Sequence, residues 1–325
     1  KYSMADLVSI VIPVYNAESF IFETIESILN QTHKELEIIF IDDKSTDRSC
    51  EIINRFEDSR IKILTQETNK GQAFALNYGI ENSSAEFVAI MHADDLMYPT
   101  RIESQLHFLL INANVDIVGS AVETFGIKKE TWHYPTTDQE CKDTLLQASP
   151  FAHPSVMFRK QRILKYFYYN QDFVPAEDYE LWVRIAGNAT FANLNERLLK
   201  YRLHENQISK LKADDEFNLI KEIRKNLIVR LLNVKELNNK KVLNACYYQD
   251  QNPANLNLEG IKLAWNANIK QKFFSKSRLS QFLRFKLKTV LLNYSIFQRI
   301  SILFRNKELI ELLGYKSTIS IIFQL

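Results

Sequence analysis

Short apolar runs alternate with stretches of helical periodicity from residue 7 to about residue 119. The runs have the length of buried strands, and the stretches between them carry apolar residues at helical spacing. Repeated strand–helix units of this size predict a parallel sheet covered by helices on both faces. The expected strands are 8–14, 36–41, 61–64, 87–91 and 115–118, and the expected helices are 21–29, 50–56, 72–82 and 100–111. We expect Asn16 to be the N-cap of the first helix.

The pattern changes twice after residue 119. Shorter runs of both types follow, with strand-like pieces at 122–125, 155–158 and 198–202 and helices near 138–147 and 177–187. From residue 211 onward apolar residues recur at helical spacing, and glycine and proline are rare. We therefore expect one α/β domain over residues 1–210, with halves at about 7–119 and 120–210, and a helical, basic region over 211–325.

The composition is that of a globular protein, because 46% of the residues are hydrophobic and 25% are charged. None of the seven glycines forms the Gly-x-Gly-x-x-Gly or Gly-x-x-x-x-Gly-Lys loop of other nucleotide-binding sheets. The three cysteines lie far apart and in no metal-ligand spacing, which favours a reducing compartment. No apolar stretch reaches the roughly 18 residues that a membrane span needs, and the first run is too short for a signal peptide. These features predict a cytoplasmic protein.

Two acidic pairs lie just past the ends of expected strands, namely Asp42-Asp43 and Asp94-Asp95. Ligands of an open α/β sheet bind at the carboxyl ends of its strands, where a carboxylate can contact a divalent cation and a phosphorylated substrate. A carboxylate only accepts hydrogen bonds, which suits a uracil N3–H or a ribose hydroxyl. Acidic pairs at strand ends are also common as turn and helix-cap residues, so neither pair is decisive alone.

Several segments occur together in the order and spacing of one enzyme family. They are Pro13-Val14-Tyr15-Asn16, Asp42-Asp43-Lys44-Ser45-Thr46-Asp47, Asn69-Lys70-Gly71, His92-Ala93-Asp94-Asp95, Glu177-Asp178-Tyr179 and Tyr201-Arg202-Leu203-His204. Over residues 6–210 the chain resembles the family 2 glycosyltransferases, which are inverting enzymes of the GT-A fold that use nucleotide-diphosphate sugars. The pattern is especially similar to bacterial enzymes that extend lipooligosaccharide or capsular polysaccharide chains.

The resemblance implies a role for each of these side chains. Asp178 would be the general base that takes the proton of the acceptor hydroxyl. Asp95 and His204 would hold Mn²⁺ or Mg²⁺ at the diphosphate. The residues expected to bind the nucleotide are Pro13, Tyr15, Asp42, Asp43, Lys70 and Asp94. Among them Asp94 would meet the ribose and Asp43 the base.

A structural explanation stands beside several of these roles. Asp178 is expected at a helix start, where the helix dipole stabilises an acid. His204 is also explained as an ordinary surface histidine. His153 either lines the acceptor site or has a structural role before a strand. The family's pattern is broken at Lys44, where glycine is common, and at His92, where an aspartate is common. Neither departure removes a carboxylate to which a role is assigned.

Residues 260–307 form a basic segment that contains eleven lysines and arginines, several interleaved aromatic residues and no Asp or Glu. Such a segment can lie in the interface of an anionic membrane, although its apolar residues could pack on the first domain instead. Nucleic-acid binding would fit the charge, but no recognised reader motif accompanies it. Because the resemblance implies a lipid-linked acceptor, we expect membrane binding and no nucleic-acid partner.

The sequence therefore predicts an inverting, non-processive glycosyltransferase on the inner face of the bacterial cytoplasmic membrane. It would move an N-acetylhexosamine or hexose from a UDP-sugar to a saccharide or lipid-linked saccharide acceptor in surface polysaccharide or lipooligosaccharide synthesis. Processive synthases of the family carry a Gln-x-x-Arg-Trp segment, which this chain lacks. The alternatives are a nucleotide-sugar-binding scaffold without turnover and a sugar-phosphate nucleotidyltransferase, which is expected to show a Gly-rich N-terminal loop.

Overall fold

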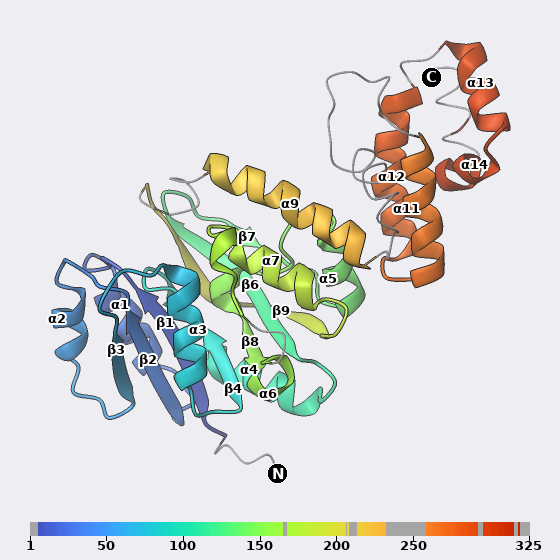
Figure 1. Cartoon of the computed structure of the whole chain (residues 1–325). Coiled ribbons are helices and arrows are strands. Elements are labelled where there is room, and N and C mark those ends of the chain that lie inside the picture. The colour runs from blue at the N-terminus through green and yellow to red at the C-terminus, as the bar shows by residue number, and fades with distance from the viewer. Residues whose placement is uncertain are drawn as a thin grey trace. The chain divides into compact units, whose positions relative to one another are not determined.

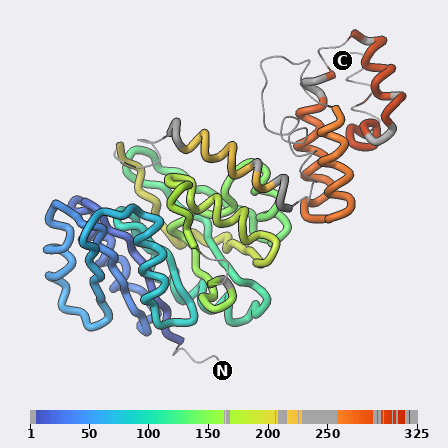
Figure 2. Tube along the Cα trace, in the orientation of Figure 1, coloured from blue at the N-terminus to red at the C-terminus, as the bar shows by residue number. Residues whose placement is uncertain are grey.

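The computed structural model describes residues 6–164, 168–205, 207, 213–231, 258–291, 295–314 and 318. The chain divides into two compact units, Lys1–Leu219 and Ile220–Leu325, and each is described by itself (Figures 1 and 2). The domain boundary expected after residue 210 stays a prediction. Residues 292–294 of the basic segment lie outside the described residues.

The first unit is built on one sheet. Its strands are β1 (Val8–Val14), β2 (Leu36–Asp42), β3 (Ile61–Thr65), β4 (Phe87–Ile90), β5 (Leu96–Met97), β6 (Ile117–Gly126), β7 (Thr131–Trp132), β8 (Met157–Arg159) and β9 (Phe191–Leu203). They lie in the order β3-β2-β1-β4-β8-β6-β9-β5, and β7 pairs with β6. β1 to β4 are parallel, β8 is antiparallel to both β4 and β6, and β9 is parallel to β6. The predicted mostly parallel sheet is confirmed.

The helices of this unit follow the expected alternation. They are α1 (Ile21–Leu29), α2 (Ser49–Asn54), α3 (Gln72–Asn82), α4 (Arg101–Ile111), α5 (Asp138–Thr144), α6 (Lys160–Ile163) and α7 (Glu177–Ile185), with single 3₁₀ turns at His153–Ser155 and Gln171–Phe173. Helix α9 (Ala213–Leu231) spans the boundary between the units.

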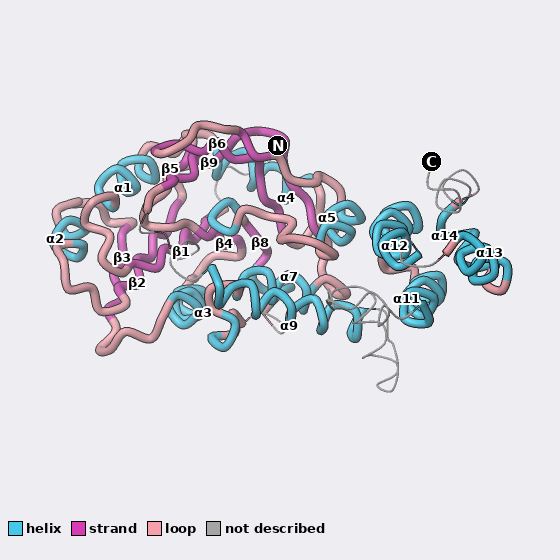
Figure 3. Tube along the Cα trace, turned by 90° about the horizontal axis from the view of Figure 1, so that it is seen from above, coloured by secondary structure: helices cyan, strands magenta, loops and turns pink. Residues whose placement is uncertain are grey.

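Helices cover both faces of the sheet, as the repeated units predict. Helix α3 packs so closely on one face that a Cβ at Gly79 would lie 2.5 Å from side-chain carbons of Val11 and Ile41. Helices α1 and α4 share a buried apolar cluster with Ile10 and Ile12, whose side chains point to the other face. Figure 3 shows α1 and α3 on opposite sides of the strands.

Two local expectations are wrong. The runs at 115–118 and 122–125 form one strand, β6, because its pairing with β9 continues across the small residues between them, with a register shift. Asn16 is not a helix cap: α1 begins after Phe20. Asn16 has φ +50°, and its Oδ1 accepts a hydrogen bond from the Thr46 N–H at 2.8 Å. The Asn16 side chain therefore ties the β1 loop to the β2 loop.

The second unit contains α11 (Leu258–Gln271), α12 (Lys276–Leu291), α13 (Ile296–Phe304) and α14 (Lys307–Leu313), which confirms a helical C-terminal region. Apolar residues at helical spacing are buried between these helices, among them Leu279, Leu283 and Leu287 of α12. The Asn268 side chain bonds both the N–H and the carbonyl of Phe274, which fixes the turn between α11 and α12. Within the described residues, no helix combines the length and the apolar character that crossing a membrane requires.

Candidate active site

The loop after β4 carries Asp94 and Asp95, and two other segments hold it in place. The Arg202 N–H, near the end of β9, donates to Asp95 Oδ1 at 2.8 Å, and Arg202 Nε donates to the Asp94 carbonyl at 2.7 Å. From α1, the Thr24 hydroxyl lies 2.9 Å from the carbonyls of Ala93 and Asp95. The acidic pair is thus fixed by residues more than 60 positions away on either side.

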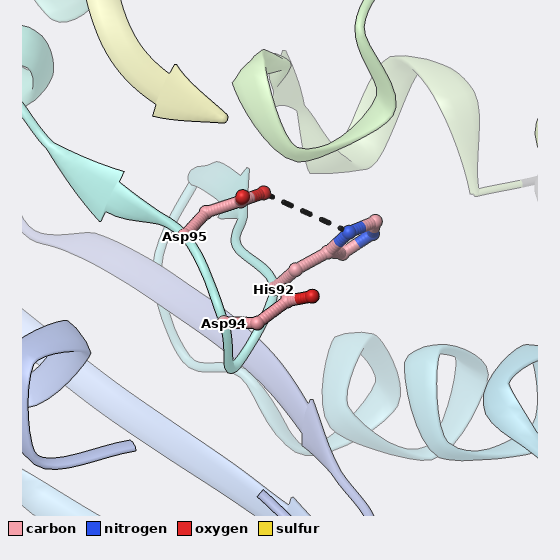
Figure 4. A group of neighbouring side chains, drawn as sticks. All are labelled: His92, Asp94 and Asp95. Carbon is pink, nitrogen blue, oxygen red and sulfur yellow. Dashed lines mark ion pairs between the residues drawn. The ribbon is translucent and has the colours of Figure 1, made fainter. Parts of the chain in front are cut away.

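Asp95 is buried, with 1% of its surface exposed, and its Oδ2 has no hydrogen-bond partner. Burial, together with the Asp94 charge, raises the pKa of Asp95 well above its usual value. One ligand atom from each of His92, Asp94 and Asp95 lies within 4.8 Å of the others (Figure 4). A buried carboxylate oxygen without a partner is unfavourable unless a cation neutralises it. Since carboxylate oxygens are the ligands of Mg²⁺ and also suit Mn²⁺, these residues fit such an ion.

A buried arginine lies near this pair. The Arg101 guanidinium, at the start of α4, is fully buried and donates to the Ile90 carbonyl at 2.8 Å. Burial lowers the pKa of Arg101 to about 9, and the Asp95 carboxylate opposes this shift. Arg101 was not predicted as a site residue, because an arginine in a helix is usually a solvent-exposed charge. The buried Arg101 cation partly offsets the negative charge of Asp95.

His204 contacts the acidic pair from the end of β9. Its Nε2 lies 2.9 Å from Asp94 Oδ2, and its ring packs on Phe20 with 4.7 Å between the centroids. The group of close ligand atoms contains His92 instead of His204. The predicted ligand role of His204 therefore stays a prediction, while its contact with Asp94 is part of the structure.

A hydrogen-bonded chain of rings leads from His92 into the core. His92 Nε2 lies 2.9 Å from His153 Nδ1, and His153 Nε2 lies 2.8 Å from the Tyr169 hydroxyl. Burial lowers the pKa of both histidines, that of His153 most, and this favours the neutral form of each imidazole. His92 was noted in the sequence only as a departure from a family pattern, and Tyr169 gave no signal because its partners are distant in sequence.

Asp178 lies in the first turn of α7, where its Oδ1 accepts the Tyr179 N–H at 2.6 Å. Burial raises the pKa of Asp178 to about 6, and the Glu216 carboxylate contributes in the same direction. Burial also raises the pKa of Tyr201, and so do the charges of Asp95, Asp94 and Asp178. Tyr201 therefore lies within electrostatic reach of both the acidic pair and Asp178. Neither Glu216 nor Tyr201 was assigned a role from the sequence.

The acids after β2 have different surroundings. Both Asp43 oxygens accept backbone N–H groups, Oδ1 from Lys70 at 2.8 Å and Oδ2 from Gly71 at 2.7 Å. Asp42 Oδ1 accepts the Ser45 N–H at 3.0 Å. These carboxylates shape the loops that follow β2 and β3, and free lone pairs remain on their oxygens because an ionised carboxylate offers about four acceptor sites.

The other predicted nucleotide residues lie at the same end of the sheet. Tyr15 follows β1 and is 53% exposed. Pro13, the residue before the last in β1, is partly buried and pairs in register with Ile41. Lys70 is exposed, and its Nζ lies 4.3 Å from the centroid of the Phe74 ring. Their arrangement is compatible with a nucleotide pocket, and their roles stay predictions.

An open depression of about 570 Å³ lies elsewhere on this unit. Its lining residues are Tyr98, Thr100, Thr131, His133, Asn195, Glu196, Arg197 and Leu198. None of the predicted site residues lines it, so its shape says nothing about the acidic site.

Comparison with known proteins identifies the family. Residues 9–168 match the model of glycosyl transferase family 2. A Haemophilus influenzae protein described as an uncharacterized glycosyltransferase is 31% identical over 265 residues, which cover 76% of this chain and 82% of the relative. The Escherichia coli protein WfaP, described as a UDP-Glc:α-D-GlcNAc-diphosphoundecaprenol β-1,3-glucosyltransferase, is 30% identical over 225 residues, 67% of this chain and 87% of the relative.

A solved structure supports the fold. The Staphylococcus aureus TarS fragment 1–349, crystallised with UDP-GlcNAc, matches with a TM-score of 0.63 and 18% identity, covering 88% of this chain and 86% of that chain. At this identity the likeness concerns the fold. The mostly parallel sheet, the acidic strand ends and the sequence matches agree, and the chain belongs to glycosyltransferase family 2, with the GT-A fold and the glycosyltransferase activity of that family.

Proposed function

We propose that the protein is an inverting, non-processive glycosyltransferase that moves an N-acetylhexosamine or hexose from a UDP-sugar to a saccharide or lipid-linked saccharide. The product would belong to a bacterial surface polysaccharide or lipooligosaccharide. One observation carries the proposal: Tyr201 lies within electrostatic reach of both the Asp94–Asp95 pair and Asp178, whose raised pKa makes it a better base than an ordinary carboxylate. The donor and the lipid-linked acceptor in the name of the relative WfaP support the substrate classes.

The proposed reaction is a single displacement. The acceptor hydroxyl transfers its proton to the Asp178 carboxylate while its oxygen forms a bond to the anomeric carbon. The bond from that carbon to the diphosphate oxygen breaks on the opposite face, and UDP leaves. Asp178 is ionised above pH 6, so its basic form is available at neutral pH. Protonation as the pH falls through about 6 removes this base, and turnover falls with it.

The acidic pair would act on the leaving group. Asp95 and His204 would hold Mn²⁺ or Mg²⁺, and Asp94 would contact the ribose. A divalent cation at this position neutralises charge that develops on a leaving diphosphate. Asp43, Asp42, Lys70, Pro13 and Tyr15 would contact the nucleotide.

The second unit would bring the enzyme to its lipid-linked acceptor. In the described part of the basic segment, Lys270, Lys272 and Arg305 are exposed, and Phe285 and Phe297 are 69% and 86% exposed. Cations attract the anionic inner leaflet, and aromatic side chains insert at the headgroup level. We therefore propose a peripheral association with the cytoplasmic face of the membrane.

The donor is tested by thermal unfolding of the full chain with a panel of nucleotides and nucleotide sugars, with and without Mn²⁺. We expect UDP and one UDP-sugar to raise Tm in a metal-dependent manner. GDP and ADP serve as matched controls. If UDP produces no metal-dependent shift, the donor assignment is wrong.

The Asp178→Asn variant separates an enzyme from a binding scaffold. We expect turnover to fall by about 10²- to 10⁴-fold, the usual contribution of a general base, while the UDP-sugar still raises Tm. Asp172→Asn, at an exposed acid in the 3₁₀ turn before α7, is the control and should retain turnover. Equal turnover in Asp178→Asn and wild type would contradict the assigned base.

Membrane association is tested by flotation with vesicles that contain anionic lipid. We expect binding at low salt, release at high salt and weaker binding after charge reversal at Lys270, Lys272 and Arg305. Charge reversal at Lys128 and Lys129, which lie in the first unit and pair with acids there, is the matched control. A protein that does not bind anionic vesicles at low salt would defeat this proposal.

A further inference from the structure

His92 directs one ring nitrogen toward the unpartnered oxygen of Asp95. The dashed line in Figure 4 joins His92 Nδ1 to Asp95 Oδ2, and the distance is 3.9 Å. This separation is too long for a hydrogen bond. Two atoms 3.9 Å apart can nevertheless bind one cation between them, because ligands lie about 2.0–2.3 Å from such an ion. A cation between these two atoms would therefore contact both a carboxylate oxygen and an imidazole nitrogen.

The opposite side of the imidazole is already fixed by the protein. His92 Nε2 contacts His153 Nδ1 at 2.9 Å, and the next contact, between His153 Nε2 and the Tyr169 hydroxyl, is 2.8 Å. If each Nε2–H donates along this chain, His92 Nδ1 keeps its lone pair on the side of Asp95. Metal-binding histidines generally use their second nitrogen in this way, donating its hydrogen to a neighbour that orients the ring. His153 is therefore a positioning residue for His92.

We propose that His92 Nδ1 is a metal ligand beside Asp94 and Asp95, and that this nitrogen makes the site select Mn²⁺ over Mg²⁺. The inference rests on the proposed function for the presence of a cation, and it adds the ligand and the selectivity. Carboxylates alone suit both ions, whereas imidazole binds first-row transition ions and is a poor ligand for hard Mg²⁺. An aspartate at position 92 would present oxygen only.

The opposite tautomer leads to a different outcome. If the Tyr169 hydroxyl donates to His153 Nε2, the hydrogens shift along the chain and His92 Nδ1 carries a hydrogen toward Asp95. His92 would then stabilise the carboxylate without binding the ion. The two arrangements share the same heavy-atom positions, so a measurement on the bound metal must distinguish them.

Pulsed electron paramagnetic resonance of Mn²⁺ on the full chain, with UDP present, detects a directly bound nitrogen. We expect a nitrogen coupling in the wild-type protein that is lost or reduced in His92→Ala. His204→Ala removes the second histidine near the ion, whose Nε2 contacts Asp94, so a coupling that persists in this variant belongs to His92. Absence of the coupling in wild type, or its full retention in His92→Ala, would overturn the proposal. Where His92→Ala does not fold, the His204→Ala spectrum decides, and loss of the whole coupling there would overturn the proposal.

Metal titration tests the selectivity. We expect His92→Ala to weaken Mn²⁺ binding about 10- to 100-fold, the effect typical of disturbing a metal site, and to change Mg²⁺ binding much less. His92→Asp should reduce the ratio of Mn²⁺ to Mg²⁺ affinity. Equal losses for both ions, or an unchanged Mn²⁺ affinity, would refute the proposal. The proposed function is tested separately, because unaltered turnover in Asp178→Asn would contradict it without affecting the metal ligand.

Discussion

Two acidic pairs lie at the carboxyl ends of β2 and β4 in the same sheet, and their surroundings differ. Asp43 gives both oxygens to the N–H groups of Lys70 and Gly71, and Asp42 accepts from Ser45. Asp95, equally buried, leaves Oδ2 without a partner and has a raised pKa. The chain itself supplies partners to the first pair, whereas in the second pair one buried oxygen, Asp95 Oδ2, has none.

The difference shows what burial does to a carboxylate. Backbone N–H groups compensate the desolvation of the Asp43 carboxyl oxygens, so this side chain stabilises the fold. Asp95 and Asp178 lack full compensation, and both have raised pKa values. Ionised acids with incomplete partners lower stability and tend to lie at functional sites. The contrast predicts opposite effects of neutralising each kind of acid.

Of the effects expected for the two acidic pairs, the largest is at Asp95. Asp95→Asn keeps an oxygen for the Arg202 N–H but removes the charge, so turnover should fall by about 100-fold or more as leaving-group stabilisation is lost. The Tm of the metal-free variant should rise, because a buried charge without a full set of partners is gone. Kinetics and thermal unfolding in chelator check both parts. A lower Tm would show that Asp95, like Asp43, stabilises the fold.

Asp43→Ala should lower the free energy of unfolding by about 2–4 kcal/mol, because two hydrogen bonds to a charged acceptor are lost and two amides are left without it. Urea unfolding of the metal-free and UDP-free protein measures this. Glu18→Ala, which removes an exposed ion pair with Arg48, is the control and should change the value by less than about 1 kcal/mol. A similarly small change in Asp43→Ala would show that the loops hold without this acid.

The third effect concerns Asp178 and depends on pH. Its folded pKa of about 6 lies above the ordinary value of 3.8, so the folded state binds the proton more tightly than the unfolded state. The stability that this group contributes is present below pH 4 and is lost as the pH rises through 6. The free energy of unfolding of Asp178→Asn should therefore exceed that of wild type by about 1–3 kcal/mol above pH 6. Below pH 4 the two values should be the same. Urea unfolding across this range checks it, and a constant difference would contradict the pKa.

The smallest effect is expected for Asp42→Asn. The amide oxygen can accept the Ser45 N–H in place of Oδ1, so the free energy of unfolding should change by less than about 1 kcal/mol. Urea unfolding measures this free energy. UDP titration tests the proposed contact of Asp42 with the nucleotide. Weaker UDP binding with unchanged stability would assign Asp42 to the nucleotide, whereas a large loss of stability would make it structural like Asp43.

Local patterns predicted much of the fold. The strands from 8–14 to 87–91 and the helix at 72–82 form as expected, because buried strands and helix faces follow short-range periodicity. The strand β9 was foreseen only at its end, since its middle carries the polar residues 195–197 and its pairing partner lies about 70 residues earlier. Asn16 was misassigned because its side-chain partner, Thr46, is distant in sequence.

The sequence by itself determined which acids stand at strand ends, since a strand's length and the residue after it are local properties. Only the tertiary structure decided which of these acids is satisfied. The N–H groups that neutralise Asp43 and the one that holds Asp95 come from segments about 30 and 107 residues away, and the partner that orients His92 comes from a segment 61 residues away. Desolvation and hydrogen bonding depend on everything packed around a group, and that arrangement exists only in the folded chain.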